Sequence, residues 1–172
     1  MRWDALFADM AGRLDADEAA QWRAEVSARE RSERASVTLA DRCAAALGAT
    51  VRLRTVDGAW CQGDLRDVAD EWVLMGDDLG REHVIPLRAV DAVEGLGAAA
   101  AHRGAVERRL TLAHALRALA RDRARVSVVT RTGQAAGLVV AVGADHADVA
   151  DRAATVTVPL VAIVRVSSQD AR

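Results

Sequence analysis

The segments VIPLRAV, residues 84–90, and TVPLVAI, residues 157–163, hold the only two prolines of the 172-residue chain in the same setting. Those prolines lie 73 residues apart, and the short segment TLA also recurs after 73 residues, at 38–40 and 111–113. A fixed period of this length indicates an internal repeat, in which each copy is one folding unit. The sequence therefore predicts two similar units in tandem.

In the first copy, the sequence pattern changes from helical to alternating near residue 51. Thr38 has the position of a helix N-cap, with Asp41 three residues later. Apolar and polar residues then alternate on both sides of the turn Asp57-Gly58, which is typical of a β-hairpin. Gly63, in the middle of the second strand, predicts a sharp bend or bulge. The predicted strands begin at Val51 and Ala59 and continue at 72–75, 83–85 and 90–96.

The second copy repeats this order. The pattern predicts a helix at 106–121 and strands at 125–130, 135–142, 146–150, 155–158 and 163–166. The expected fold class is α+β, with a small five-stranded antiparallel barrel in each copy. We divide the chain into an N-terminal helical arm at 1–36, a first unit with its leading helix at 37–96, a linker at 97–104, a second unit with its leading helix at 105–168, and a tail at 169–172.

Composition argues against several classes of function. The chain has no Lys, so it has no GxxxxGK phosphate loop, and its four His and two Cys do not occur at metal-ligand spacing. Cys43 and Cys61 are predicted to be small buried residues, and His146 a partly buried structural residue. We therefore expect no catalytic residue, no metal site and no cofactor, and the protein is not expected to be an enzyme.

The few cysteines and the lack of a signal-like amino terminus favour a cytoplasmic protein. No apolar run is long enough to cross a membrane, so no membrane partner is expected.

Charge is distributed unevenly along the chain. The formal net charge is −2, but residues 101–125 hold seven Arg against Glu107 and Asp122. This basic segment is either a solvated helix face that pairs with the acidic first unit or a phosphate-binding surface. The candidate nucleic-acid contacts in it are Arg103, Arg108, Arg109, Arg117, Arg121, Arg123 and Arg125.

Aromatic residues give two further candidates. Strand alternation places Trp60 on the opposite side from Cys61, so its ring is predicted to face outward, where it either stacks a base or is covered by the N-terminal arm. The arm itself has an apolar stripe at helical spacing, which packs on its own units or on another protein. That stripe contains Trp3, Leu6, Phe7 and Met10.

A helix followed by five short bent strands resembles the Sm-like family of small barrels, which includes the Hfq RNA chaperones. The likeness covers about 37–96 and 110–168, and in the first unit its motif residues are Val51, Leu53, Gly58, Gly63, Leu65, Val68 and 72–74. The positions of the family's RNA pocket differ here, with 69–72 lacking Asn and 85–87 lacking the basic or glycine element, so that pocket is not carried over. The chain also resembles a family of two-barrel proteins of high-G+C bacteria, whose Arg-Trp-Asp start it shares at residues 2–4.

The resemblance implies a non-enzymatic binding protein with RNA as the ligand. The alternative is a protein-interaction or scaffold module without a nucleic-acid ligand, which would use the N-terminal arm and the exposed sheet edges. In Sm-like proteins the fourth strand of one barrel pairs with the fifth strand of the next, and tandem units are able to form this pair within one chain. Three chains would then supply six barrels and close a homo-oligomeric ring.

Overall fold

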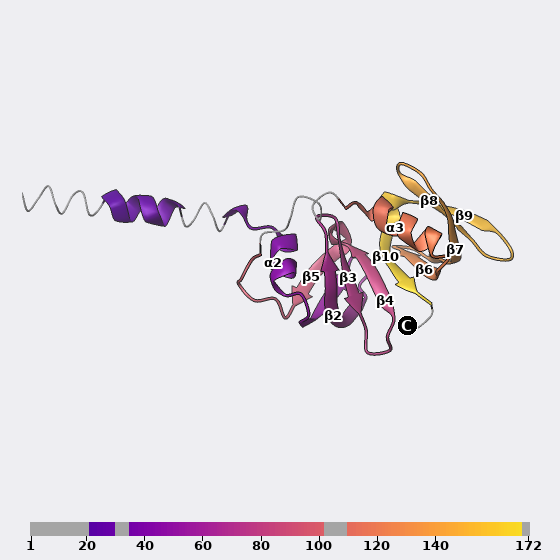
Figure 1. Cartoon of the computed structure of the whole chain (residues 1–172), viewed down its shortest axis with the longest axis horizontal. Helices are drawn as coiled ribbons and strands as arrows, with labels where there is room; N and C mark the ends of the chain where they lie inside the picture. The colour runs from indigo at the N-terminus through magenta and orange to yellow at the C-terminus, as the bar shows by residue number, and fades with distance from the viewer. Residues whose placement is uncertain (1–20, 30–34, 102–109, 170–172) are drawn as a thin grey trace, which may run out of the picture. The chain divides into compact units, whose positions relative to one another are not determined.

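The computed structural model describes residues 21–29, 35–101 and 110–169 (Figure 1). The chain divides into two compact units, Met1–Val37 and Thr38–Arg172. In the first unit, residues 21–29 are helical. In the described part of the chain, no helix combines the length and apolar character needed to cross a membrane.

The second unit contains two copies of one order of elements. Each copy begins with a helix, continues with four strands, and has a short 3-10 helix before its fifth strand. The first copy consists of α2 (Leu39–Ala45), β1 (Thr50–Thr55), β2 (Trp60–Val68), β3 (Trp72–Gly76), β4 (Glu82–Pro86), η1 (Leu87–Ala89) and β5 (Val90–Glu94). The second consists of α3 (Leu112–Arg121), β6 (Arg125–Thr130), β7 (Gln134–Val142), β8 (His146–Ala150), β9 (Thr155–Pro159), η3 (Leu160–Ala162) and β10 (Ile163–Ser168).

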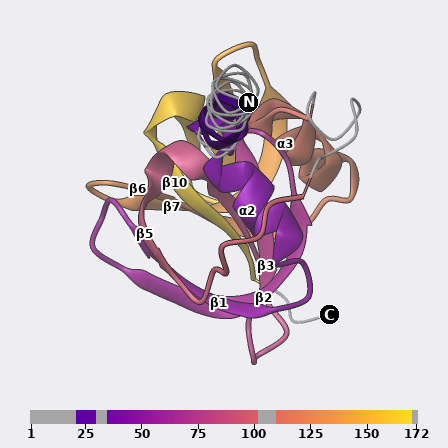
Figure 2. The ribbon, with the colours of Figure 1, turned by 90° about the vertical axis from the view of Figure 1, so that its left-hand side faces the viewer.

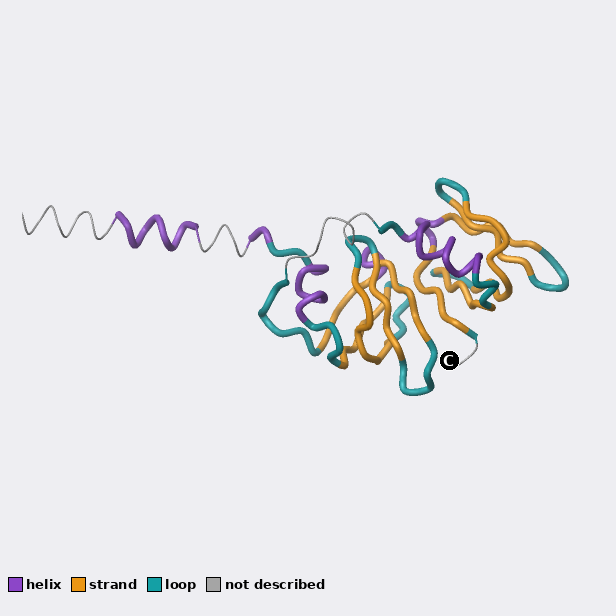
Figure 3. The backbone as a smooth tube through the Cα atoms, viewed as in Figure 1, coloured by secondary structure: helices purple, strands orange, loops and turns teal. Residues whose placement is uncertain are grey.

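All ten strands belong to one antiparallel sheet, in the order β5-β1-β2-β3-β4-β10-β6-β7-β8-β9 (Figure 3). The α+β class and the positions of the predicted strands are confirmed. The sheet is open, with β5 and β9 at its two edges. The finer prediction of two five-stranded barrels is not confirmed, because the ten strands form one open sheet. Within this sheet β4 of the first copy pairs with β10 of the second, the fourth-to-fifth strand pair that tandem units were expected to be able to form: Val84 lies opposite Val166, and His83 opposite Ser167.

Corresponding strands have the same register in both copies. Val51 of β1 lies opposite Gly63, and Val126 of β6 lies opposite Gly137. Gly63 was predicted to mark a sharp bend or bulge, and the bulge is not at this residue, since the register irregularity falls between Leu65 and Asp67. Gly63 is needed for another reason, since a Cβ at this position would collide with the carbonyl group of Gly76 on β3.

Both helices begin at a threonine cap. The Thr38 hydroxyl accepts a hydrogen bond from the Asp41 amide at 3.1 Å, and the Asp41 carboxylate accepts one from the Thr38 amide at 2.9 Å. Thr111 occupies the same position before α3, where its amide donates to Nδ1 of His114 at 3.2 Å. The prediction of one helix over 106–121 is therefore wrong at Thr111, because an N-cap residue is not itself helical and α3 begins after it.

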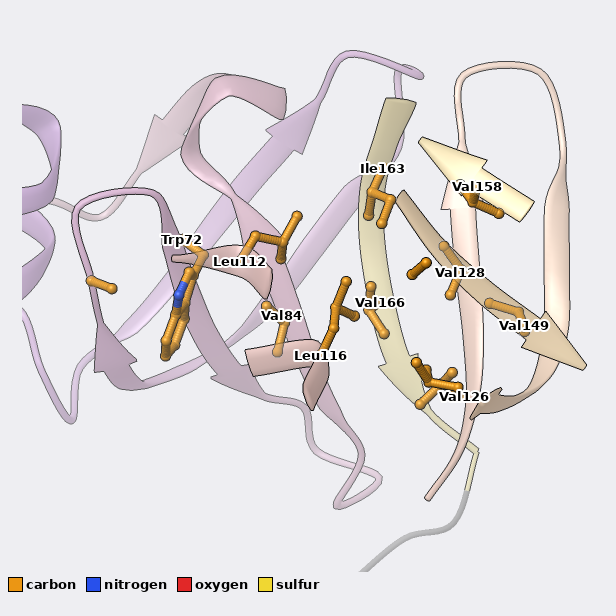
Figure 4. Close-up of a cluster of buried hydrophobic side chains, with 13 residues drawn as sticks. Trp72, Val84, Leu112, Leu116, Val126, Val128, Val149, Val158, Ile163 and Val166 are labelled. Atoms are coloured by element: carbon orange, nitrogen blue, oxygen red, sulfur yellow. The ribbon is translucent and has the colours of Figure 1, made fainter. Parts of the chain in front are cut away.

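Two clusters of buried side chains form the core. One lies within the first copy and includes Val51, Leu53 and Ile85. Figure 2 shows the curved strands β1 and β2 of this copy. The other combines residues of both copies. In Figure 4, Trp72 and Val84 of the first copy lie with Leu112, Leu116, Val128 and Val166 of the second. The two halves of the sheet therefore share apolar packing as well as backbone pairing.

Candidate functional site

The sequence-predicted site residues lie in three places. Arg103, Arg108 and Arg109 fall outside the described residues, as do Trp3, Leu6, Phe7 and Met10 of the arm. Arg117 and Arg121 lie on α3, and Arg123 follows its C-terminal end with a positive φ of 51°. Trp60 and Arg125 begin β2 and β6. The structure therefore does not gather the predicted residues into a single surface.

The described arginines of α3 and its C-terminal end are exposed to solvent. Arg117 donates from Nη2 to the carbonyl oxygen of Gly143 at 3.2 Å, which ties it to the β7–β8 turn. Neither Arg121 nor Arg123 forms an ion pair with a described residue, and both are exposed. This end of the helix presents positive charge to solvent.

Trp60 faces away from the core, as predicted, and is 40% exposed. Its ring lies beside two arginines of β1, with the guanidinium carbons of Arg52 and Arg54 at 4.6 and 5.7 Å from the ring centre. Those arginines also pair with acids of β5, Arg52 with Glu94 at 2.6 Å and Arg54 with Asp91 at 2.8 Å. Whether the N-terminal arm covers Trp60 stays a prediction: of the arm residues proposed to cover it, Phe7 and Met10 lie outside the described ranges, and Trp22 is 67% exposed.

A polar pocket of about 820 Å³ lies where the two copies meet, and it brings Trp60 and Arg125 together. One wall is a face of β6 and β10, because alternate residues of a strand point to the same side. Ser127 lies opposite Ser167 across these strands, and Val129 lies opposite Arg165. The other wall comes from the start of β2 and from the turn between β3 and β4.

Arg165 is the charged residue that sequence reasoning missed. It is half-buried in the pocket wall and donates from Nη1 to the Sγ atom of Cys61 at 2.7 Å. Its Nε atom is buried without a hydrogen-bond partner, and no carboxylate of a described residue lies within ion-pair distance. A guanidinium stays charged at all ordinary pH values, so the pocket wall contains a cation without an ion-pair partner among the described residues.

A hydrogen-bonded network supports the opposite wall. Asp77 accepts at Oδ1 from the amide of Arg81 at 2.8 Å and at Oδ2 from the Arg81 side chain at 2.8 Å. Burial acts to raise the pKa of Asp77, but hydrogen bonds from the Arg81 backbone, His83 and the Arg81 side chain outweigh it and lower the pKa to about 2. The Asp77 carboxylate is therefore ionised and fully engaged within its own turn.

His83 connects this network to β10. Burial, opposed by Asp77, lowers the pKa of His83, so the imidazole is neutral near pH 7. Its Nε2 lies 3.1 Å from Oδ2 of Asp77, and its Nδ1 lies 2.8 Å from Oγ of Ser167. Because an ionised carboxylate only accepts, Nε2 carries the proton and Nδ1 accepts from the Ser167 hydroxyl.

The histidine of the second copy lies in a different setting. His146 is partly exposed, and its Nδ1 lies 2.8 Å from Oδ1 of Asp145, which raises the pKa of His146. It opens β8 as Trp72 opens β3, and the two residues lie opposite Pro159 and Pro86 respectively. Among the residues that the structure describes, no three His, Cys, Asp or Glu side chains are grouped so that they could hold a metal ion.

The chain matches no known family model, and no curated protein is significantly similar to it. The functional argument therefore rests on the internal repeat and on the pocket.

Side-chain contacts reinforce the junction between β4 and β10. The indole nitrogen of Trp72 donates to the carbonyl oxygen of Leu110 at 3.1 Å, and the carboxylate of Glu71 accepts from the amide of Leu112 at 3.0 Å. Arg88, after β4, donates to the carbonyl oxygen of Leu160. The first copy thus contacts both the start of α3 and the segment that leads into β10.

Proposed function

We propose that the protein is a non-enzymatic binding protein made of two Sm-like barrels, and that separate chains assemble head to tail through the edges of their sheets. In this assembly β9 of one chain pairs with β5 of the next. The observation that supports it is the pairing of β4 with β10 inside the chain. In the repeat, β9 of the second copy corresponds to β4 of the first, and β5 of the first corresponds to β10 of the second. The two free edges of the sheet are therefore equivalent to the two strands that pair inside the chain.

Solvent exposure of equivalent residues supports the proposal. His83 on β4 is 9% exposed, whereas Val156, its equivalent on β9, is 47% exposed. Leu112 at the start of α3 is 2% exposed, whereas Leu39 at the start of α2 is 36% exposed. Exposed apolar side chains along an unpaired strand favour association with another strand. The residues left exposed are therefore the ones whose equivalents are buried at the internal junction.

The side-chain contacts of the junction have counterparts at the edges. Glu71 accepts from the amide of Leu112, and Asp145, the residue before β8, is the equivalent of Glu71. The Asp145 side chain is 91% exposed, so it is available to accept from the amide of Leu39 in a second chain. In the proposed assembly, the contact between the acid and the helix amide would therefore be repeated between chains together with the strand pair.

Size-exclusion chromatography with light scattering tests the assembly. We expect the mass of the wild-type chain to rise with concentration, toward the three chains that the Sm-like resemblance implies. Val156→Lys on β9 is expected to give a monomer, because a lysine opposes pairing at a strand edge. Leu39→Lys at the start of α2 is expected to do the same, because the equivalent Leu112 is buried at the internal junction. Val140→Lys is the matched control, since Val140 is 56% exposed on β7, away from both edges.

Mixing the two edge variants sharpens the test. Each keeps one intact edge, and these edges are complementary, so an equimolar mixture of Val156→Lys and Leu39→Lys should form a dimer and nothing larger. A symmetric contact between identical edges would not show this rescue. A wild-type chain that stays monomeric at about 100 μM, a concentration well above that needed for micromolar affinity, would contradict the proposal.

RNA is a second candidate function, favoured by the exposed cations at the end of α3. Arg121, Arg123 and Arg125 are exposed and form no ion pair with a described residue. Cations of this kind release counterions from nucleic acid, which makes binding weaken steeply as salt concentration rises.

Fluorescence anisotropy with a labelled single-stranded RNA, measured at about 50 and 200 mM salt, tests this candidate. The variant with Arg108, Arg109, Arg117 and Arg121 all replaced by Glu should lose binding. Binding that is unchanged in this variant would exclude the site. Binding that does not depend on salt would favour an apolar protein partner instead.

A further inference from the structure

We infer that the pocket between the two copies binds a phosphate group, with Arg165 as its central contact and Arg125 as a second cation. The inference concerns a single chain and does not depend on the assembly; it shares Arg125 with the RNA candidate but uses none of the arginines of α3. It rests on the pocket, on the cation without an ion-pair partner in its wall and on the donors around it.

The environment of Arg165 demands an anion. A half-buried guanidinium loses hydration, and a carboxylate usually compensates for that loss. Here the described residues offer Arg165 only the thiol of Cys61, a weak acceptor, while Nε has no partner at all. The planar guanidinium matches a phosphate through two parallel hydrogen bonds, which would satisfy the donors that the protein leaves open.

No described acid forms an ion pair with Arg165, although the charge of Arg165 contributes to lowering the pKa of Asp57. Asp77 is committed to Arg81 and His83, and Asp57 accepts from the Thr55 hydroxyl at 2.6 Å and from the Ala59 amide at 3.2 Å. Asp78 is exposed at the rim of the pocket. The described lining residues include three arginines against two carboxylates, and the histidine is neutral, so these residues together carry a net positive charge.

Neutral donors complete the site. The Ser168 hydroxyl oxygen accepts from the Glu82 amide at 2.9 Å, which leaves its proton free to donate. Ser127 and Gln134 line the same wall, with no hydrogen bond from their side chains to a described residue. A phosphate carries several acceptor oxygens and needs donors on more than one side, and the two guanidinium groups and these side chains supply them.

The repeat shows that the fold does not require this arginine. Arg165 on β10 lies opposite Val129, and the equivalent residue on β5 is Ala92, which lies opposite Arg54. The first copy builds the same strand with an alanine. The charge in the pocket is therefore a property of the junction between the copies and not of the barrel pattern.

Trp60 lines the pocket beside Cys61 and suggests how the source of the phosphate can be distinguished. Inorganic phosphate would use only the cations and hydroxyl groups. A nucleoside monophosphate would also place its base near the indole ring, where stacking adds affinity. Both sources share the phosphate, and calorimetry can separate them.

Isothermal titration calorimetry of the full chain with inorganic phosphate, uridine monophosphate and uridine tests the inference. We expect phosphate and the monophosphate to bind, and uridine not to bind. Arg165→Gln should weaken both by at least about tenfold, the loss expected for one charge-assisted contact. Arg152→Gln is the matched control, because Arg152 is exposed in the β8–β9 turn and does not line the pocket. Trp60→Ala should weaken only the monophosphate if the base stacks there.

Melting temperatures, measured with and without phosphate, provide a second test that can be read even if a variant is less stable. Phosphate should raise the melting temperature of the wild type and of Arg152→Gln but not that of Arg165→Gln. Without phosphate, Arg165→Gln should melt at the same or a higher temperature than the wild type, since it removes an unpaired charge. Binding of uridine as tight as that of its monophosphate, equal phosphate binding by the two arginine variants, or no binding of phosphate at about 10 mM would each overturn the inference.

Discussion

Strands β4 and β9 have nearly the same sequence at their ends, but their burial is different. Both lead into a proline and a 3-10 helix, and both pair with the third strand of their own copy. Four of the five residues of β4 are buried, whereas only Val158 of β9 is. The difference arises from the neighbouring strand, because β10 covers one side of β4 and no described strand covers that side of β9. Burial here depends on position in the sheet.

The largest effect should come from a feature that the two copies share. Gly63→Ala would push a methyl group into the carbonyl of Gly76, so we expect a loss of at least about 3 kcal/mol in the free energy of unfolding. Gly133→Ala is the control, because nothing lies within 4 Å of the added carbon. Urea unfolding followed by circular dichroism gives both values. Equal stability of the two variants would contradict the close approach of β2 and β3.

Leu112 and Leu39 test the difference between the copies. Leu112→Ala removes a buried side chain from the shared core and should cost about 2.5 kcal/mol of unfolding free energy. Leu39→Ala, at the equivalent position of α2, should cost less than about 1 kcal/mol when measured on dilute monomer. The comparison fails if Leu39→Ala proves as destabilising as Leu112→Ala under these conditions.

Asp77 and Asp151 begin equivalent turns and should respond differently to pH. The pKa of Asp77 is about 2 in the folded protein against 3.8 for the free group, so its stabilising contribution is present above about pH 4 and is lost as pH falls from 3.8 toward 2. We expect the wild type to lose about 1 kcal/mol more than Asp77→Asn over this range.

Asp151→Asn provides the comparison for that titration. Backbone hydrogen bonds from Ala154 and Ala153 lower the pKa of Asp151, with a smaller contribution from the charge of Arg125, and no histidine or arginine side chain of the described residues hydrogen-bonds to it. Its acid titration should follow that of the wild type closely. Stability curves from pH 2 to 6 that superpose for Asp77→Asn and the wild type would show that the Asp77 network contributes nothing.

The smallest effect should come from adding a junction contact to the free edge. Val161 is 78% exposed and is the equivalent of Arg88, which donates to the carbonyl oxygen of Leu160 across the junction. Val161→Arg should therefore donate to Leu87 of the next chain and lower the concentration of half-assembly by about threefold. Light scattering over a dilution series measures this. A weaker assembly would show that the outer edges do not reproduce the inner junction.

The alternation of apolar and polar residues was sufficient to place the strands. Period-two patterning around Asp57-Gly58 and the repeated proline segments predicted all ten strands to within a few residues. The outward direction of Trp60 and the buried positions of Cys43 and Cys61 followed from the same pattern and are confirmed. These features depend on neighbours along the chain, which a sequence contains directly.

The pocket could not be predicted in this way. Arg165 lies between Val164 and Val166 and looks like an ordinary outward residue of a strand. Its partner Cys61 is 104 residues away, in the other copy, so only the junction reveals the contact. The helix start at Thr111 was within reach, because it repeats the cap at Thr38, but the alanine- and arginine-rich sequence before it has high helix propensity and hid the cap.

The pairing of β4 with β10 also restricts which assemblies the protein can form. One covalent chain always contributes two halves, the two copies of the repeat, already joined in a fixed order. A closed assembly built by repeating this junction therefore contains an even number of halves, and rings with five or seven are excluded. Within such a ring the junctions alternate between an inner one, whose strength is independent of protein concentration, and an outer one, which dilution can open. In such a ring, tandem duplication thus replaces equivalent junctions by two kinds, one permanent within each chain and one reversible between chains.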